Sequence, residues 1–224
     1  MTDADTAVEA PRPLRKDAAR NRALLVEAGR AVFAERGLDA SLDDIARHAG
    51  LGVGTAYRHF TNKYELAQAI FSEAIEEIVA LADRALIADD PWGGLVLFLE
   101  GAAAAQTADR GLREVMMGVY DPSKMEEVNE RISAPLRELV ARAHAEGTLR
   151  EDVEMTDIGV LILMLCTVAD VTGDDAPDLW RRYLPMLLAG LRADVDLPVA
   201  PMTEEAFRAT MACHKQRHAL ANRS

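Results

Sequence analysis

The chain of 224 residues has little of several features that would indicate other classes of protein. Its two cysteines, Cys166 and Cys213, exclude a framework of several disulfides and are typical of a reducing, cytoplasmic setting. Residues 1–11 have no apolar stretch after a basic start, so we expect no secretory signal. The most apolar run, residues 158–169, is shorter than the roughly 20 residues that span a bilayer. We therefore expect a soluble protein without a membrane segment.

Signals for strands and for common catalytic sites are also missing. Alternating runs of Val, Ile and Thr are few, and neither Asn-Gly nor Asp-Gly occurs. The motifs His-Glu-x-x-His, Glu-x-x-His, Gly-x-Ser-x-Gly and Cys-x-x-Cys are absent, which excludes the common hydrolase, di-iron and redox sites. Gly50, Gly52 and Gly54 do not form a dinucleotide motif, because no strand precedes them and Thr55 stands where Gly is needed. These absences predict an all-α protein that is not an enzyme and holds no cofactor.

The net charge of −12 argues at first against a polyanionic partner. The charge is uneven, however, because residues 12–63 contain ten basic and six acidic residues and so carry +4. Residues 1–11 carry −3, and residues 64–224 carry −13. This asymmetry indicates a basic module on an acidic remainder, and the basic module is the candidate for contact with nucleic acid.

Helix signals follow one another closely in the basic module. Apolar residues at helical spacing predict a helix over residues 17–36 that ends near Gly37. Ser41 and Asp44 have the spacing of a capping box, and we expect them to open a short helix over residues 42–49.

A turn that contains glycine leads to a second short helix over residues 53–60. Thr61 is predicted to cap a long amphipathic helix that follows. Two short helices joined by such a turn indicate a helix-turn-helix, in which the second helix enters the major groove of DNA. A helical corner that binds nothing has the same outline and is the alternative.

The residues of this corner form a recognisable set: Ala46, Ala49, Gly50, Gly54, Thr55, Tyr57, Phe60, Lys63 and Leu66. With these hallmarks the chain resembles the DNA-binding domain of the TetR family of bacterial transcriptional repressors. The resemblance covers roughly residues 18–66. Gly52 departs from the family, in which Ser often caps the recognition helix, and Ala56 stands where Leu is frequent. The resemblance implies a ligand-responsive repressor that binds a palindromic, double-stranded DNA operator as a homodimer, with recognition helices roughly 34 to 36 Å apart.

The resemblance also implies how the chain is organised. Residues 1–11 are expected to be a disordered tail, and residues 12–66 the helix-turn-helix domain. Residues 67–196 would form a helical effector-binding and dimerisation domain, and residues 197–224 a linker with a C-terminal surface helix. The alternatives are an all-helical small-molecule-binding protein or enzyme without DNA binding, an interaction module, and an activator of the same fold.

Polar side chains of the second short helix are the predicted readers of DNA. Arg58 and His59 are expected at base edges, because Arg58 can donate two parallel hydrogen bonds to guanine. The hydroxyls of Thr55 and Tyr57 and the ammonium of Lys63 are expected at phosphates. Further candidates are Ser41 as a cap and phosphate donor, Gly52 for its backbone amide, and Val53 for a thymine methyl.

Three basic residues, Arg12, Arg15 and Lys16, precede the first predicted helix in a segment that contains Pro11 and Pro13. They are predicted to form a flexible arm that enters an adjacent minor groove. A solvated charged tail explains them equally well.

The remainder of the chain contains two helices suited to a dimer interface. The helix over residues 156–171, capped by Thr156, is apolar almost all round, so we expect burial on more than one side. In the TetR family the last two long helices form a four-helix dimer interface, which implies residues 156–171 and 178–192 for this role. Burial within one chain is the alternative. Pro135 is expected to kink or divide the preceding helix.

Acidic, aromatic and Met side chains of the same region are candidates for a pocket that binds a small-molecule effector. The predicted pocket residues are Trp92, Glu100, Met116, Met117, Tyr120, Met164 and Asp170. Core packing and solvent-facing acids explain them without a ligand. Cys213, His214 and His218 are a possible metal group near the C-terminus, but a polar surface helix explains them more simply, so we expect no metal.

Overall fold

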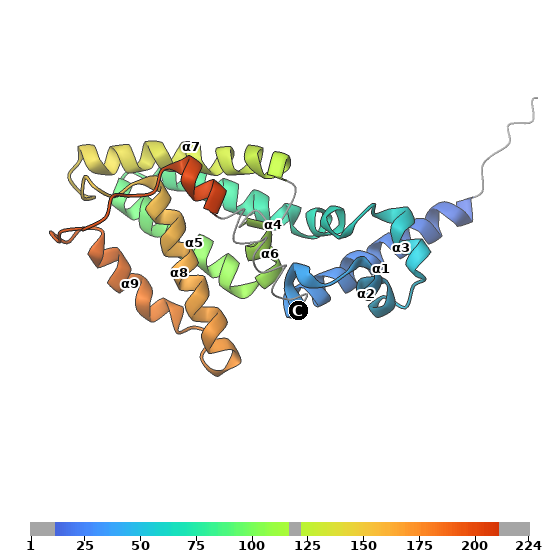
Figure 1. Cartoon of the computed structure of the whole chain (residues 1–224). Coiled ribbons are helices and arrows are strands. Elements are labelled where there is room, and N and C mark those ends of the chain that lie inside the picture. Colours follow the sequence, from blue (N-terminus) through green and yellow to red (C-terminus); the bar gives the residue numbers. More distant parts are fainter. Residues whose placement is uncertain (1–11, 117–121, 211–224) are drawn as a thin grey trace, which may run out of the picture.

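The computed structural model describes residues 12–116 and 122–210, and every regular element in them is a helix, which confirms the all-α prediction. The elements are α1 (Arg12–Arg36), η1 (Gly37–Asp39), α2 (Leu42–His48), α3 (Val53–His59), α4 (Lys63–Leu86), α5 (Pro91–Ala108), α6 (Arg110–Glu114), α7 (Pro122–Ala145), α8 (Met155–Thr172), η3 (Gly173–Asp175) and α9 (Trp180–Gly190). Residues 204–210 are also helical. Figure 1 shows α1 to α3 as a head at one end, and α4 running from it to the body formed by α5 to α9.

The helix ends of the head follow local signals. α1 ends at Arg36, and the next residue, Gly37, has a φ of 62°, a left-handed conformation that suits glycine. Ser41 Oγ accepts a hydrogen bond from the Asp44 N–H at 3.1 Å, and Asp44 accepts one from the Ser41 N–H at 3.1 Å. These two bonds confirm the predicted capping box. Ile45 and Phe60 are buried beneath the short helices and belong to the common apolar core.

The start of α4 differs from the prediction. Asn62 caps the helix, because its side-chain oxygen accepts hydrogen bonds from the N–H groups of Tyr64 and Glu65 at 2.9 and 3.0 Å. The prediction of Thr61 as the cap is therefore wrong. The Thr61 N–H instead donates to the Glu65 carboxylate at 2.7 Å, so Thr61 lies one residue before the cap.

Head, α4 and body meet at a contact between three residues. The ring centroids of Phe33 in α1 and Phe71 in α4 lie 6.3 Å apart. Gly111 of α6 lies against both side chains, since a Cβ placed there would be 2.6 Å from Phe71 Cζ and 3.1 Å from Phe33 Cβ. Only a residue without a side chain permits α6 to approach the aromatic pair this closely.

Pro135 lies inside α7, and the helix continues through it, so the predicted division does not occur. Proline removes one backbone hydrogen bond and usually weakens a helix at that point. Contacts with α4 hold α7 on both sides of the proline. Arg131 forms two hydrogen bonds with Glu76, at 2.7 and 2.6 Å, and Arg142 donates to the Leu86 carbonyl. Packing thus outweighs the local signal.

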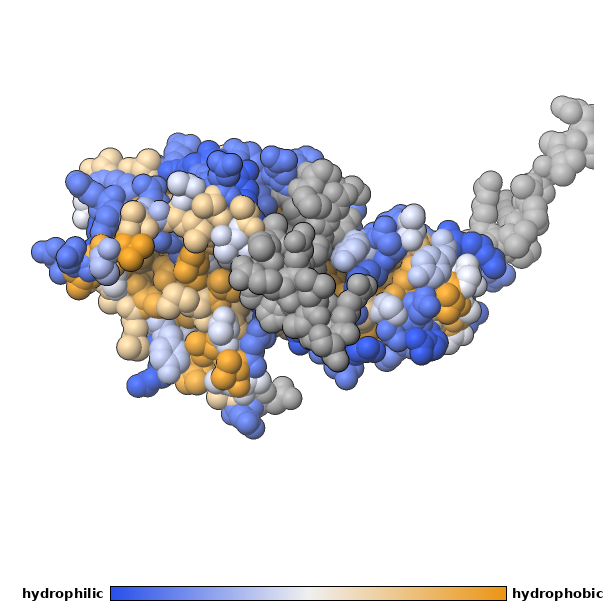
Figure 2. Space-filling model, viewed as in Figure 1, coloured by the Kyte–Doolittle hydropathy of each residue, from blue (hydrophilic) through white to orange (hydrophobic). Residues whose placement is uncertain are grey.

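α8 and α9 leave much of their apolar surface open. α8 is long and apolar enough to cross a membrane by length and composition, with a mean hydropathy of 1.8, yet only 28% of it is buried. Large exposed apolar side chains on the two helices are Met164, Val171, Tyr183 and Met186. Figure 2 shows hydrophobic residues on the surface over this part of the body. The burial on several sides that the sequence predicts is therefore not provided within one chain.

The chain after α9 returns across the body to the helical residues 204–210 (Figure 1). Thr156 Oγ1 donates to the Met202 carbonyl at 2.8 Å, and Arg137 Nε lies 3.1 Å from the Glu204 carboxylate. Thr156, predicted to cap α8, lies instead in its first turn and holds this C-terminal segment in place.

Candidate functional site

The outer face of α3 carries the central residues of the predicted DNA-binding set. Val53 and Tyr57 are 37% and 52% exposed, and Arg58 is also exposed. Ala56 and Phe60, which point the other way, are 0% and 1% exposed. Arg58 forms no ion pair with any residue in the described part of the chain. Its guanidinium is therefore available for an external partner.

The other predicted residues of the head lie around this face. Thr55 and His59 are half-buried on α3, and Gly52 begins the helix without a side-chain cap. Lys16 is exposed on α1. The side chain of Arg15 lies outside the described residues. The structure thus gathers Gly52, Thr55 and His59 on the element that carries Arg58. Lys16 lies on α1, which begins at Arg12, so the prediction of a flexible arm before residue 17 is wrong for residues 12–16.

Ser41 uses its hydroxyl inside the head. Its Oγ–H donates to Asp44 Oδ2 at 2.6 Å, in addition to the capping bonds. Hydrogen bonds from Ser41 lower the pKa of Asp44 below its ordinary value, and the cations Arg47 and Arg36 add to this effect. A phosphate contact from Ser41 would therefore compete with the cap of α2.

Tyr57 pairs with a carboxylate of the neighbouring helix. Its hydroxyl bonds to Asp43 of α2, which raises the pKa of Tyr57 above the ordinary value. A tyrosine hydroxyl has a single proton to donate, so the predicted phosphate contact of Tyr57 would compete with its bond to Asp43. Asp43 also adds a negative charge beside the exposed face of α3.

Lys63, the first residue of α4, is held against the head. Its ammonium donates to the Leu38 carbonyl of η1 at 2.5 Å, and burial lowers the pKa of Lys63, while Asp39 and Glu114 favour its charged form. Lys63 thereby ties the first turn of α4 to η1. The predicted phosphate contact would require the ammonium to leave the Leu38 carbonyl.

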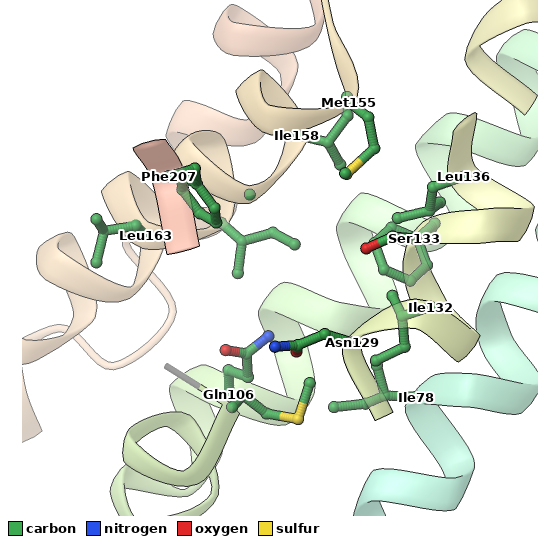
Figure 3. Close-up of a pocket in the computed structure, with 14 residues that line it drawn as sticks. Ile78, Gln106, Asn129, Ile132, Ser133, Leu136, Met155, Ile158, Leu163 and Phe207 are labelled. Atoms are coloured by element: carbon green, nitrogen blue, oxygen red, sulfur yellow. The ribbon is translucent and has the colours of Figure 1, made fainter. Parts of the chain in front are cut away.

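The body contains a cavity of about 150 Å³ between α4, α5, α7, α8 and residues 204–210, which is partly open to solvent. Fourteen of the described residues line it, and none carries a charge. The polar side chains among them are Gln106, Asn129 and Ser133. Figure 3 shows Gln106 and Asn129 pointing toward one another at one end, with apolar side chains around the rest. An apolar chamber with few, convergent polar groups is the usual form of a small-molecule site.

Among the predicted pocket residues, Met116 lines this cavity, whereas Met117 and Tyr120 lie outside the described residues. Of the lining residues, Gln106 carried a signal that sequence reasoning missed. It is a polar side chain in an otherwise apolar, alanine-rich stretch of α5, and it is 6% exposed. Phe207 carried no such signal, because its place over the cavity depends on the return of the chain after α9.

The remaining predicted pocket residues lie elsewhere. The Trp92 ring lies 4.9 Å from the guanidinium of Arg192. Glu100 forms an exposed ion pair with Arg181 at 3.7 Å, and Met164 is 47% exposed. The prediction of these residues as lining the pocket is therefore wrong, because residue type does not tell which face of a helix is turned toward the other helices.

α6 connects the cavity to the head. Arg113 is 5% exposed, donates to the Gln106 carbonyl at 3.0 Å and pairs with Asp170 of α8. Asp170, predicted in the pocket, thus neutralises Arg113 instead. The next residue, Glu114, accepts a hydrogen bond from the Leu38 N–H of η1 at 2.5 Å. The adjacent side chains of Arg113 and Glu114 therefore bond α6 to Gln106 at the cavity and to η1, which precedes the helix-turn-helix.

Among the described residues, no group of three or more His, Cys, Asp or Glu side chains is arranged to hold a metal ion. Cys213, His214 and His218 lie outside that part of the chain. Cys166 is 1% exposed in α8, and burial raises the pKa of its thiol to about 11. This thiol stays protonated at neutral pH and packs as a small apolar group, as predicted.

A helix-turn-helix head joined to a larger helical body is the architecture of a two-part DNA-binding regulator. Comparison with known proteins agrees. The model for bacterial regulatory proteins of the tetR family matches residues 25–70, and the model for the C-terminal domain of SbtR-like transcriptional regulators matches residues 90–193. The chain belongs to the TetR family, which confirms the predicted family.

Individual relatives are moderately similar. The TetR transcription regulatory protein from Mycobacterium vanbaalenii is 34% identical, over 81% of this chain and 100% of that chain, with a TM-score of 0.46. The TetR family regulator PfmR from Thermus thermophilus is 26% identical, over 76% and 96% of the two chains, with a TM-score of 0.57. An HTH-type transcriptional regulator of Staphylococcus aureus (strain USA300) is 36% identical over 64 residues, or 28% of this chain. The match spans about a third, 35%, of that curated relative.

Proposed function

We propose that the protein is a ligand-responsive transcriptional repressor that binds a palindromic operator as a homodimer. The exposed face of α3 carries this proposal, because Val53, Tyr57 and Arg58 project from a helix whose other face is buried in the head. The major groove is about 12 Å wide and admits such a helix. Arg58 would donate two hydrogen bonds to one guanine, and Val53 would contact a thymine methyl.

The charge distribution also favours an orientation in which the head faces the DNA. Residues 12–63 carry +4 and residues 64–224 carry −13, so phosphates attract the head and repel the body. This arrangement presents α3 to DNA and limits non-specific binding through the rest of the surface. Because the attraction depends on exposed charges, operator affinity should fall steeply as the salt concentration rises.

In-vitro selection of DNA from a random pool tests this proposal, with the full chain at two salt concentrations. The expected result is a palindrome whose half-sites are centred about one helical turn apart. Arg58→Ala should lower affinity for that operator by roughly 1–3 kcal/mol, about 5- to 150-fold, with the fold unchanged. Arg84→Ala, which removes an exposed arginine from the far end of α4, is the matched control. No enrichment at low salt would contradict the proposal.

A second copy of the chain is proposed to cover α8 and α9. Their exposed Met164, Val171, Tyr183 and Met186 form the kind of apolar surface that a monomer rarely leaves open. In the family, the corresponding two helices pack against their counterparts, which would supply the burial that α8 lacks in one chain. Two heads would then face two half-sites, as a palindrome requires.

Sedimentation at micromolar concentration tests the dimer. Val171→Glu places a charge at a side chain that is 82% exposed in one chain, so we expect monomers and a loss of operator binding. Ile87→Glu is the control, because Ile87 is 79% exposed but lies after α4. A wild-type chain that stays monomeric, or that inserts α8 into lipid vesicles, would contradict the proposal.

α6 is the proposed link between ligand and operator. A ligand in the cavity would press on Gln106 and Met116, which precede and follow α6 in the chain. α6 is also bonded to the head, because Glu114 accepts a hydrogen bond from the Leu38 N–H. The ligand releases DNA only if it binds more tightly to an arrangement in which the heads no longer match the half-sites. Ser133→Phe places a ring in the cavity and should lower operator affinity about 5- to 150-fold.

Glu114→Gln tests the link, because it weakens the hydrogen bond to Leu38 without touching α3. In the Ser133→Phe background it should restore part of the lost affinity. Transcription in vitro from a promoter that overlaps the selected operator tests the direction of regulation. Repression predicts fewer transcripts as protein is added, and an increase would contradict it.

A further inference from the structure

The cavity has a lining that discriminates ligands by charge. None of the fourteen described residues around it is ionisable. The buried cation among the described residues is the Arg113 guanidinium, but it pairs with Asp170 and donates to the main-chain carbonyl of Gln106. An ionised ligand would leave water without gaining a counter-charge, which is strongly unfavourable. The cavity therefore favours an uncharged molecule.

Gln106 points to the position of the ligand's polar group. Its side chain is 94% buried and lines the cavity, and its carboxamide makes no hydrogen bond to a residue in the described part of the chain. The carboxamide faces the cavity space, so a water molecule or a polar ligand group there can form hydrogen bonds with it. Figure 3 shows the Asn129 carboxamide facing the same space, so two amides converge on one point.

We propose that the cavity binds a neutral, mainly apolar molecule with the bulk of about one aromatic ring, whose single polar group is held by Gln106 and Asn129. This inference rests on the proposed function of the cavity as the effector site. A carboxamide both donates and accepts hydrogen bonds, so the matching polar group is an amide, hydroxyl or similar uncharged group. The apolar part lies among side chains such as Phe98, Ile162 and Phe207.

The volume sets the size of the ligand. An apolar cavity of 150 Å³ admits a molecule of the size of benzene. Pockets for larger, drug-sized ligands measure about 300–1,000 Å³. A one-ring ligand therefore fits the cavity as it stands, with Phe207 of the C-terminal segment kept in place as part of the wall.

Three probes of nearly equal size test the proposal on the full-length protein at neutral pH. Benzamide is neutral with a polar group, benzoate is its charged counterpart, and toluene has no polar group. Calorimetric titration should show binding of benzamide about tenfold tighter than toluene, and no detectable binding of benzoate. Benzoate or toluene binding as tightly as benzamide would overturn the proposal, and so would the absence of binding by all three.

Two variants assign the binding to the amide pair. Gln106→Leu removes the carboxamide at similar volume, so benzamide affinity should fall about tenfold while toluene affinity is unchanged. Asn129→Leu provides the same test should Gln106→Leu lose its native circular dichroism spectrum. Thr107→Val is the control, because the Thr107 hydroxyl donates to the Ala104 carbonyl outside the cavity. Unchanged benzamide affinity in a folded Gln106→Leu or Asn129→Leu variant would overturn the role of the amides.

Operator binding measured in parallel separates this inference from the proposed function. Benzamide binding that leaves operator affinity unchanged would support the ligand class and overturn the effector role. Release of the operator by benzoate, with binding of benzoate to the protein, would support the effector role and overturn the preference for a neutral ligand.

Discussion

The head and the body consist of the same kind of element but are held together differently. In the head, side chains three residues apart close the helix ends, as Ser41 and Asp44 do for α2. In the body, the decisive bonds join distant parts of the chain, such as Arg131 with Glu76 and Arg113 with Asp170. The head is thus specified mostly by local interactions and the body mostly by packing.

This difference matches the proposed roles. A surface that reads DNA must have a constant shape, and short, capped helices over a buried Phe60 provide one. A cavity between helices changes when those helices move, so it suits a ligand that shifts the protein between two arrangements. α6 lies between the two regions, because Glu114 bonds to η1 and Arg113 bonds to the main chain of Gln106, which lines the cavity.

The largest expected effect is on the core that both regions share. Phe71→Ala should lower the free energy of unfolding by about 3–5 kcal/mol, because a fully buried ring at the junction is replaced by a cavity. Denaturation followed by the fluorescence of Trp92 and Trp180 reports the body, and hydrogen exchange of α3 reports the head. Both should lose stability together. A loss confined to one region would show that they fold independently.

Gly111→Ala tests the junction itself. The new Cβ would lie 2.6 Å from Cζ of the fully buried Phe71 ring, so the ring or the helix must shift. We expect destabilisation of roughly 1–3 kcal/mol from overpacking, measured by urea denaturation. Because α6 must shift away from Phe33 and Phe71, operator affinity should also fall. A variant with wild-type stability would mean that α6 is not tightly seated.

Ser41→Ala is confined to the head and should lower stability by about 1 kcal/mol through loss of the cap. The effect depends on pH. Ser41 keeps the pKa of Asp44 below its ordinary value of 3.8, so the stabilisation is present above that pH and is lost as pH falls through the lowered pKa. The difference between wild type and variant should therefore shrink in acid. A constant difference from pH 6 to 3 would contradict the role of Asp44.

Gly54→Ala has the smallest expected effect and the opposite sign. No atom lies within 4 Å of the added Cβ, and Gly54 lies inside α3 with an ordinary helical conformation. Alanine should stabilise the head by about 0.5–1 kcal/mol, measured by hydrogen exchange of α3. Together with Gly111→Ala, this substitution compares an exposed helical glycine with a packed one. If the variant were destabilised, the added methyl group of residue 54 would have to meet an atom that the structure does not place within 4 Å of it.

Most helices and the cap of α2 were predictable, because their signals lie within a few residues of the elements that they define. The errors arose where two local signals competed or where distant contacts prevailed. Asn62 takes the capping position from Thr61, and α7 continues through Pro135 with contacts to α4 on both sides of it. The ammonium of Lys63 lies on the Leu38 carbonyl because α4 starts beside η1, a placement that no local pattern contains.

The sequence by itself determined the all-α class, the family and the helix on which Arg58 stands, because caps, helical periodicity and the helix-turn-helix hallmarks act over short distances. Only the tertiary structure decided that Gln106 and Asn129 face one cavity and that Phe207 closes it. It also decided that α8 remains largely uncovered in one chain. The physical reason is that a cavity or an open face is defined by helices far apart in the chain, and their relative rotation follows from packing.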